Sequence, residues 1–375
     1  MSEKSRRPLA LAIAMSTALG LLTFSSLASA QSSQSLRENE QRARGQTSDK
    51  DEVKEEDHAK PALYPNATRK SPEIKVLPKM GKHLQALQQR YEKEDWAGVV
   101  QKADEIGGMA DASAYAKAFA YSMAGNAMAN ENDQAKAEEF FAKAVAADGL
   151  DNDGHFSVMY NLAVTQFGEE KYDAALSTLD RFLAETKSDK PDQLAFRAGV
   201  LANLDRYSEA AEIYRGLLAK NPSDKRSLMN AVAALQNSDK YDEANLLLED
   251  AYKRGMLTES RELRSLYIGY MNTQRWNDAE KVIEDGLAKG ILQAGPDLAR
   301  DYQVLAQNAY QDDKMPLAIA LYSKAAPMAA DGEAYLNLAK VLDYAGKKVE
   351  AKAAAKQALE KGVKKPEDAN RILAR

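Results

Sequence analysis

The sequence predicts an all-α protein built from one repeated pair of helices. Alanine, leucine, glutamate and lysine are abundant, and only 11 of the 375 residues are proline. Apolar residues recur at helical spacing, and runs of β-branched residues at period two are hard to find. One phrase, an aromatic residue followed three positions later by an alanine, returns along most of the chain. No segment therefore requires a β-sheet.

Residues 1–30 have the residue order of a cleavable export signal. Lys4, Arg6 and Arg7 precede an apolar run over residues 9–22, and the small residues 28–30 follow it. This run is shorter than the roughly 20 residues that a membrane span needs. We expect cleavage after Ala30, no stable membrane insertion afterwards, and a periplasmic location, with secretion as the second choice. General export is favoured, and twin-arginine export is the alternative.

Residues 31–79 are predicted to form a disordered, charged linker. The segment mixes serine, glutamine and charged residues with Pro61, Pro65, Pro72 and Pro78. Such a composition cannot bury enough apolar surface to order itself. Its only apolar clusters are residues 63–65 (Leu-Tyr-Pro) and 74–77. A short partner-binding motif is the alternative interpretation.

Residues 80–365 repeat the aromatic–alanine phrase. The clear copies are Tyr172 with Ala175, Tyr207 with Ala210, Tyr241 with Ala244, and Trp276 with Ala279. Weaker copies centre on Val99, Ala137, Ala318 and Ala351. Successive small residues of this series are 33 to 39 residues apart. The spacing predicts about eight pairs of helices.

The small residues have a physical role in such pairs. Two helices approach to about 8–10 Å only where small side chains meet. Ala163 with Ala175, and Ala339 with Ala351, are expected at these crossings. Each helix pair leaves an apolar face uncovered, so neighbouring pairs must stack on one another.

The pattern resembles the tetratricopeptide repeat (TPR) family, whose unit is a 34-residue helix–turn–helix. The residues that carry the resemblance are Tyr335, Leu338, Ala339 and Leu342 in one first helix, Ala318, Tyr322 and Ala325 in one second helix, and Pro222 at a repeat boundary. The resemblance implies a right-handed superhelix of about eight repeats over residues 80–365. The first repeat, residues 82–107, departs from the pattern and is interpreted as degenerate. Residues 366–375, which start at a proline, are expected to form a C-terminal capping helix.

Composition and motifs give no support to catalysis. The chain has no cysteine, and its three histidines, His58, His83 and His155, are scattered. No phosphate-binding glycine loop or nucleophile motif occurs, and acidic residues alternate with lysine as on solvated helix faces. We therefore predict no catalytic residue, no metal site, no cofactor and no enzymatic role. A formal net charge of −5 gives no support to nucleic-acid binding.

The resemblance also implies a binding surface on the concave face, formed mainly by the first helix of each pair. Asn126 and Asn161 stand at the family's positions for gripping a peptide backbone. Long polar side chains follow at Arg261, Arg264, Arg300, Gln303, Gln307 and Asn337. The family's carboxylate-gripping groove is not expected, because Ser122, Asp192 and Phe196 replace its basic residues. The alternative is that all of these are ordinary polar surface residues.

The sequence thus favours a non-enzymatic scaffold or adaptor of the bacterial cell envelope. It is expected to bind a protein or peptide partner of open identity on the concave face. One alternative is a structural spacer that self-associates into a homo-oligomer. The other is an accessory subunit of an envelope secretion, outer-membrane assembly or polysaccharide-export complex.

Overall fold

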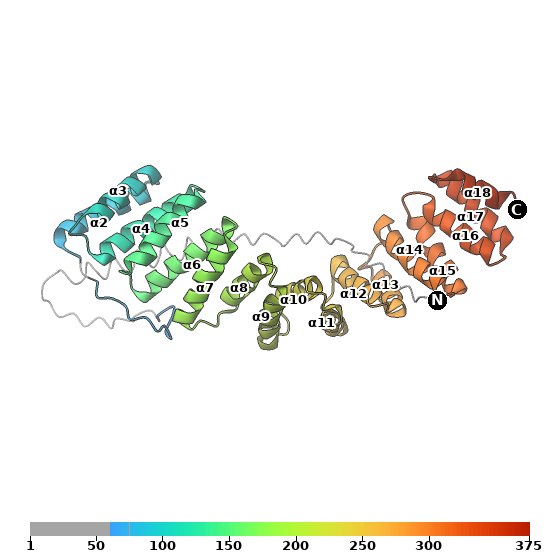
Figure 1. Ribbon diagram of the computed structural model, residues 1–375, viewed down its shortest axis with the longest axis horizontal. Coiled ribbons are helices and arrows are strands. Elements are labelled where there is room, and N and C mark those ends of the chain that lie inside the picture. The colour runs from blue at the N-terminus through green and yellow to red at the C-terminus, as the bar shows by residue number, and fades with distance from the viewer. Residues whose placement is uncertain (1–60, 75) are drawn as a thin grey trace, which may run out of the picture. The chain divides into compact units, whose positions relative to one another are not determined.

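The computed structural model describes residues 61–74 and 76–375. The predicted export signal and residues 31–60 of the predicted linker lie outside these described residues. The described part contains seventeen α-helices and no β-strand. It divides into two compact units, one ending at Ala234 and the other covering residues 235–375, and the division falls within helix α10. Each unit is a stack of paired helices (Figure 1).

The first unit contains eight complete helices. They are α2 (Pro78–Glu92), α3 (Trp96–Gly108), α4 (Ala114–Asn130), α5 (Gln134–Ala147), α6 (Asn152–Gly168), α7 (Tyr172–Thr186), α8 (Pro191–Asn203) and α9 (Tyr207–Lys220), and α10 (Lys225–Asn237) follows. From α2 to α9, each helix packs against the next one in the chain. This consecutive packing is what a stack of helical hairpins requires.

The second unit contains eight further helices. They are α11 (Tyr241–Lys253), α12 (Ser260–Asn272), α13 (Trp276–Ala288), α14 (Pro296–Gln311), α15 (Met315–Met328), α16 (Glu333–Tyr344), α17 (Lys348–Lys361) and α18 (Pro366–Leu373). Helix α18 packs on both α16 and α17 and buries Ala369 and Ile372. It therefore covers the apolar face of the last helix pair.

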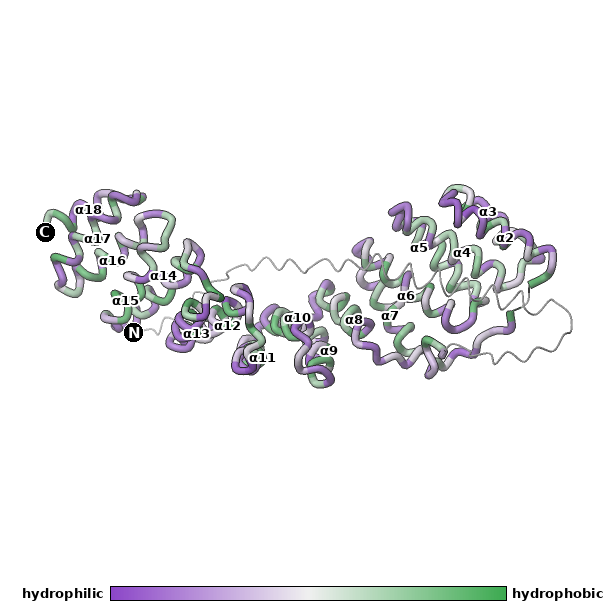
Figure 2. Tube along the Cα trace, turned by 180° about the vertical axis from the view of Figure 1, so that it is seen from behind, coloured by the Kyte–Doolittle hydropathy of each residue, from purple (hydrophilic) through white to green (hydrophobic). Residues whose placement is uncertain are grey.

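The small residues of the repeated phrase are all fully buried. Val99, Ala137, Ala175, Ala210, Ala244, Ala279, Ala318 and Ala351 have no exposed surface. Ala163 and Ala339, predicted on the facing helices, are buried to the same extent. In Figure 2 the helices carry green, apolar stretches, while the turns between them are purple and hydrophilic. The core therefore runs along the seam between successive helices.

Each turn within a helix pair contains one residue in the left-handed region, two positions before the second helix. These residues are Glu94, Asn132, Glu170, Asp205, Asp239, Gln274, Asp313 and Gly346, with φ between 55° and 76°. In two of the pairs, an aromatic residue opens the second helix and packs on an aromatic five positions earlier. The ring centroids of Tyr172 and Phe167 are 5.4 Å apart, and those of Trp96 and Tyr91 are 5.3 Å apart. In these two pairs the aromatic of the repeated phrase fills the space under the turn.

Residues 61–71 differ from the disordered linker predicted for residues 31–79. They form no helix or strand, yet they lie against the first unit, and only 9% of Tyr64 is exposed. The Arg69 side chain is 11% exposed. We call residues 61–71 the N-terminal strap. Its order comes from specific contacts with helix ends, which a composition-based argument does not register.

The left-handed turns generate a stability prediction at Glu170, whose side chain is exposed. A β-branched residue is strained at positive φ, whereas glycine is not. We expect Glu170→Val to unfold more easily than Glu170→Gly, with a difference of about 2 kcal/mol in the free energy of unfolding. Urea denaturation followed by circular dichroism measures it. Equal urea midpoints for the two variants would show that this turn holds no backbone strain.

Candidate functional site

Asn126 and Asn161, predicted to grip a peptide backbone, lie together but are buried. The Nδ2 atom of Asn161 donates a long hydrogen bond to Oδ1 of Asn126, at 3.5 Å. The two side chains are only 4% and 8% exposed, and they join α4 to α6. Neighbouring helix pairs thus use these amides to hold each other. In this arrangement the two amides are not exposed to a partner, which differs from the surface position predicted for them.

Each arginine predicted to line the binding surface has an acidic partner within the chain. Arg261 Nε lies 2.8 Å from Glu259 Oε2, and Arg300 pairs with Asp297. The Arg261 and Arg300 side chains remain 80% and 69% exposed, so these ion pairs are solvated and weak. Arg264 is held more firmly, because its Nε and Nη2 atoms each lie 3.1 Å from an oxygen of Asp301.

The Arg264–Asp301 pair forms the centre of a polar cluster between α12 and α14. Asp301 is 2% exposed, and it also accepts a hydrogen bond of 2.8 Å from the hydroxyl of Tyr267. The hydrogen bonds to Asp301 raise the pKa of Arg264, and burial raises the pKa of Tyr267. A cleft of about 420 Å³ opens beside the cluster. The carboxylate of Asp301 already neutralises the one arginine that lines this cleft.

The remaining predicted residues lie in the same unit as the arginines. Gln307 is exposed on α14, whereas Gln303 on α14 and Asn337 on α16 are partly exposed. Helices α14 and α16 contact each other. The eight predicted residues therefore form two sets. The asparagine pair belongs to the first unit, and the other six belong to the second.

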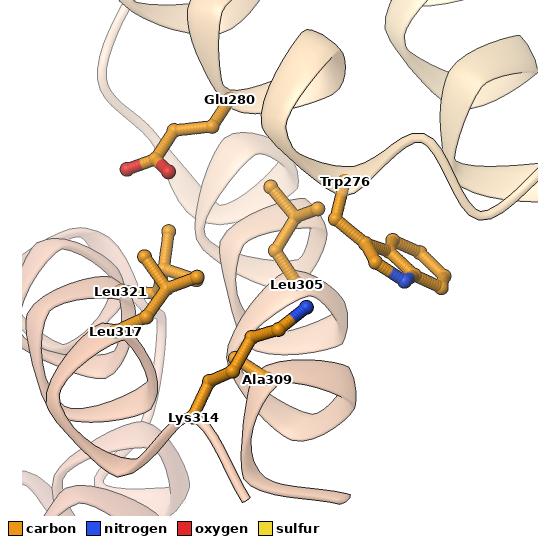
Figure 3. Close-up of a pocket in the computed structure, with 7 residues that line it drawn as sticks. All are labelled: Trp276, Glu280, Leu305, Ala309, Lys314, Leu317 and Leu321. Carbon is orange, nitrogen blue, oxygen red and sulfur yellow. The ribbon is translucent and has the colours of Figure 1, made fainter. Parts of the chain in front are cut away.

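A small cavity lies between α13, α14 and α15. Figure 3 shows Trp276 and Glu280 on one side of it, with Leu305, Ala309, Lys314, Leu317 and Leu321 around the rest. Its volume is about 10 Å³, which is at most the space of one water molecule. The cavity is too small to hold a ligand. The described residues also contain no group of three or more histidines or carboxylates placed to bind a metal ion.

The most elaborate site of the first unit holds the aromatic ring of the strap. Tyr64 packs edge-on against Phe156 of α6 and Phe182 of α7, with ring centroids 5.5 Å away in both cases. The ammonium group of Lys190 lies over the Tyr64 ring at 4.9 Å. Tyr160 and Phe196 back these rings, because Tyr160 contacts both Phe182 and Phe196. We call Phe156, Tyr160, Phe182 and Phe196 the aromatic socket.

The environment of Tyr64 is apolar around the ring and polar at the hydroxyl. Burial raises the pKa of Tyr64 to about 12, and a hydrogen bond with the Gln193 side chain acts in the opposite direction. Asp153 and Asp192 contribute smaller upward effects. The hydroxyl therefore stays protonated at neutral pH. An aromatic side chain with a polar tip fits this combination.

Arg69 anchors the other end of the strap at the C-terminus of α5. Its Nε atom donates to Asp148 Oδ1 at 2.8 Å, and its Nη1 atom donates to Asn152 Oδ1 at 2.9 Å. Its Nη2 atom donates to the carbonyl oxygens of Asp148 and Leu150, at 3.1 and 2.9 Å. A cation at this place satisfies carbonyls left open at the helix end and complements the helix dipole.

Main-chain atoms of the strap make the remaining contacts. The N–H of Leu63 donates to Asp153 Oδ1 at 3.1 Å, and the N–H of Thr68 donates to the carbonyl of Glu185 at 2.8 Å. The side chain of Asn152 donates to the carbonyl of Arg69 at 2.8 Å. Between the two anchors the strap turns, because the N–H of Ala67 donates to the carbonyl of Tyr64 at 3.2 Å. The site thus binds main-chain groups of the strap together with one aromatic and one basic side chain. The apolar cluster at residues 63–65 is visible in the sequence, but its contacts are not. No local sequence pattern shows which helix ends it lies against.

His155 is buried close to the Arg69 anchor. It is 1% exposed, and neither ring nitrogen has a hydrogen-bond partner among the described residues. Burial lowers its pKa to about 4, and the neighbouring charge of Arg69 acts in the same direction. The ring packs edge-on against Phe156. His155 is therefore neutral at pH 7, and its Nδ1 atom lies 3.5 Å from Asp148 Oδ1 without forming a hydrogen bond.

The buried histidine predicts an acid-sensitive first unit. The unfolded chain binds a proton near pH 6.5, whereas native His155 resists protonation down to about pH 4. Its contribution to stability is therefore complete above pH 6.5 and is lost as the pH falls from 6.5 to 4, by about 3 kcal/mol. We expect His155→Leu to flatten this part of the stability profile, measured by urea denaturation at successive pH values. His83→Leu is the matched control, and an unchanged slope in His155→Leu would contradict the assignment.

The Arg264–Asp301 pair predicts strong coupling between two helices of the second unit. Arg264→Met leaves the Asp301 carboxylate buried without its cation, so we expect a loss of about 3 kcal/mol. Adding Asp301→Asn removes the charge but keeps an acceptor for Tyr267, and should recover at least about 1 kcal/mol. Thermal and urea denaturation measure both variants. Arg261→Met, which breaks an exposed pair, should change stability by less than about 0.5 kcal/mol, and equal losses at both arginines would contradict the cluster's role.

No protein-family model matches the sequence, and no curated protein matches it. None of the helices in the described residues is long and apolar enough to cross a membrane.

Several solved structures resemble this chain in fold, although the two sequence comparisons found no match. A chain in the structure of Naa15/Naa10 bound to HypK-THB aligns at a TM-score of 0.52 and 13% identity, over 74% of this chain and 42% of that one. A tetratricopeptide repeat protein from Parabacteroides merdae aligns at 0.40 and 18% identity, over 68% of this chain and 96% of that one. The C-terminal part of a TPR repeat-containing protein from Cytophaga hutchinsonii aligns at 0.46 and 20% identity, over 65% and 97%. With the paired helices, their left-handed turns and the buried alanines at each crossing, the fold of this chain is an all-α solenoid of the tetratricopeptide type.

Proposed function

We propose that this chain is a non-enzymatic scaffold that binds a segment of a partner protein across the ends of α5 to α8. One observation carries the proposal: the chain's own strap lies there without helix or strand, held by side chains and by main-chain hydrogen bonds. The site therefore has the size and chemistry to receive a peptide. It replaces the asparagine pair as our candidate in the first unit.

The contacts of the strap resemble those that dominate protein interfaces. Tyrosine and arginine are the residue types over-represented where a few side chains supply most of the binding energy. Here Tyr64 enters the aromatic socket and Arg69 meets Asp148 and two carbonyl groups. Main-chain hydrogen bonds add affinity without requiring a particular sequence. A partner segment that supplies these two side chains would use the site in the same way.

The structural comparisons support a role in protein assembly at the level of the fold. The structure with a TM-score of 0.52 is described as Naa15/Naa10 bound to HypK-THB, so a similar helical array takes part in a protein complex. The only property of that complex that bears on our proposal is the use of a helical array to hold proteins.

The cell envelope of a bacterium is the location that we propose. Residues 1–30 support it through their basic start, apolar run and small residues before the expected cleavage site at Ala30. The scaffold would then meet its partner in the periplasm. A role as an accessory subunit of an envelope secretion, assembly or export complex is compatible with this placement.

Self-association as a structural spacer is the second candidate. Tyr344 and Val349 near the last helix pair are 73% and 85% exposed, and Tyr344 packs edge-on against Tyr310. Exposed apolar side chains of this kind can join two copies of a chain. A concentration-dependent mass in light scattering, abolished by Tyr344→Ala, would favour this candidate over peptide capture.

In-cell photo-crosslinking tests the proposed function. A photoreactive phenylalanine analogue replaces Lys190 beside the socket, in the full-length protein carrying Tyr64→Ala and Arg69→Ala so that the strap is weakened. We expect crosslinks to one short segment of one envelope protein, identified by mass spectrometry, on a chain that begins at Gln31 and is recovered from the periplasm. The same analogue at the exposed Arg215 of α9 is the matched control.

Two outcomes would contradict the proposal. Crosslinks from positions 190 and 215 to the same broad set of proteins would show that the site selects no partner. Recovery of the crosslinked chain with residues 1–30 still attached and in the cytoplasm would contradict the envelope location.

A further inference from the structure

We infer that the strap is an internal ligand that keeps the aromatic socket occupied until a partner segment of the same chemistry displaces it. That segment carries an aromatic residue followed by proline, and an arginine five residues after the aromatic, as in Tyr64, Pro65 and Arg69. This inference rests on the proposed peptide-binding function and adds its regulation and the chemistry of its partner.

The socket is formed by residues outside the strap. The rings of Phe156 and Phe182 lie 6.2 Å apart, those of Tyr160 and Phe182 lie 5.4 Å apart, and those of Tyr160 and Phe196 lie 5.7 Å apart. These contacts join three helices, α6, α7 and α8, whether or not Tyr64 is present. The pocket is therefore ready to take another aromatic side chain when Tyr64 leaves.

Two side chains anchor the strap. Its residues form no helix or strand, and Leu63, Pro65 and Asn66 are exposed. Tyr64 and the Arg69 side chain are 9% and 11% exposed, and hydrogen bonds at Leu63, Thr68 and Ser71 add to these anchors. Releasing the strap removes these contacts and leaves the packing between helices in place. Such a segment can detach at a much lower cost than any helix of the array.

The strap is also an incomplete ligand. The Oε1 atom of Gln193 is buried and has no hydrogen-bond partner among the described residues, although the same side chain bonds to Tyr64. Only 5% of Gln193 is exposed. A buried acceptor without a donor is destabilising. A partner segment that brings one more donor beside its aromatic residue therefore gains an interaction that the strap does not make.

Charge defines the partner further. Acidic side chains border the strap on several elements: Asp148, Asp153, Glu185 and Asp192. Lys190, over the Tyr64 ring, and Arg181, on α7, are the basic side chains near the two anchors. Acidic peptides are disfavoured at such a border, whereas a peptide with a basic residue at the Arg69 position is favoured. The fitting partner segment is therefore basic, with an aromatic–proline pair that can form the same turn as residues 64–67.

Tethering gives the strap an advantage over any free peptide. A segment joined to its site by a short flexible linker has an effective concentration in the millimolar range. A free copy of the strap should therefore bind poorly to the intact protein. It should bind well once the internal copy has lost its anchors, and this difference is measurable.

The test uses a fluorescent synthetic peptide with the sequence of residues 61–71 and the full-length protein. We expect fluorescence anisotropy to show at least tenfold tighter peptide binding to the Tyr64→Ala, Arg69→Ala variant than to the unmodified protein. A peptide with alanine at its tyrosine and arginine positions should not bind. The matched control protein, with Tyr344→Ala and Arg206→Ala on exposed sites, should behave as the unmodified protein does. Adding Lys190→Glu to the released variant should weaken peptide binding.

Equal binding of the peptide to the unmodified and the released protein would overturn the inference. So would an absence of binding to a released variant that retains its helical circular dichroism. Should that variant fail to fold, a protein with a protease cleavage site in place of residues 72–77 serves instead. After cleavage, exchange of the strap for labelled peptide supports the inference, and a strap that never exchanges overturns it. Because this test needs no cellular partner, it can succeed where the crosslinking test of the proposed function fails, and the reverse.

Discussion

The close approach of two helices at an alanine is the constraint on which this structure depends. Ala137, Ala175, Ala210 and their equivalents have no exposed surface, and a larger side chain at any of them would separate the helices that form the pair. Where an aromatic residue stands three positions earlier, as Tyr172 does before Ala175, it can also fill the space under the turn. Because the same solution recurs every 33 to 39 residues, the chain becomes a stack whose units meet mainly their neighbours.

This constraint explains why the sequence was informative about the fold. Period, residue size and helix propensity are all local, and together they placed the helix pairs and identified the tetratricopeptide-type fold. The left-handed turn residues were not foreseen, because seven of the eight are not glycine. Glutamate, glutamine, aspartate and asparagine occupy them instead, and these residues give no reliable signal for positive φ.

The binding surface was much harder to predict. Asn126 and Asn161 could be placed on the correct helices, but whether they face solvent depends on side chains from the next helix pair. The partner of Arg264 is Asp301, 37 residues away, and no spacing rule connects the two. The strap lies further still from its contacts, since Leu63 and Asp153 are 90 residues apart. The average composition of residues 31–79 did not reveal the few strap residues that bind to the first unit.

The strap also supplies hydrogen-bond donors for carbonyl groups at helix ends. The last carbonyls of a helix have no partner within it, and the repeated hairpins leave such ends along one edge of the stack. Arg69 and the N–H of Thr68 satisfy carbonyls at the ends of α5 and α7. The strap has no helix or strand of its own, but its hydrogen bonds to these helix ends hold it in one position. Any displacing peptide has to replace these bonds.

One consequence concerns the way in which the first unit opens. In a simple stack, each hairpin can fray without disturbing those beyond its neighbours. The strap contacts α5, α6, α7 and α8 at once, so it links three consecutive hairpins through a single segment. A link of this kind couples the opening of one hairpin to the opening of the next two. The strap therefore makes this part of the stack more cooperative than nearest-neighbour packing alone would.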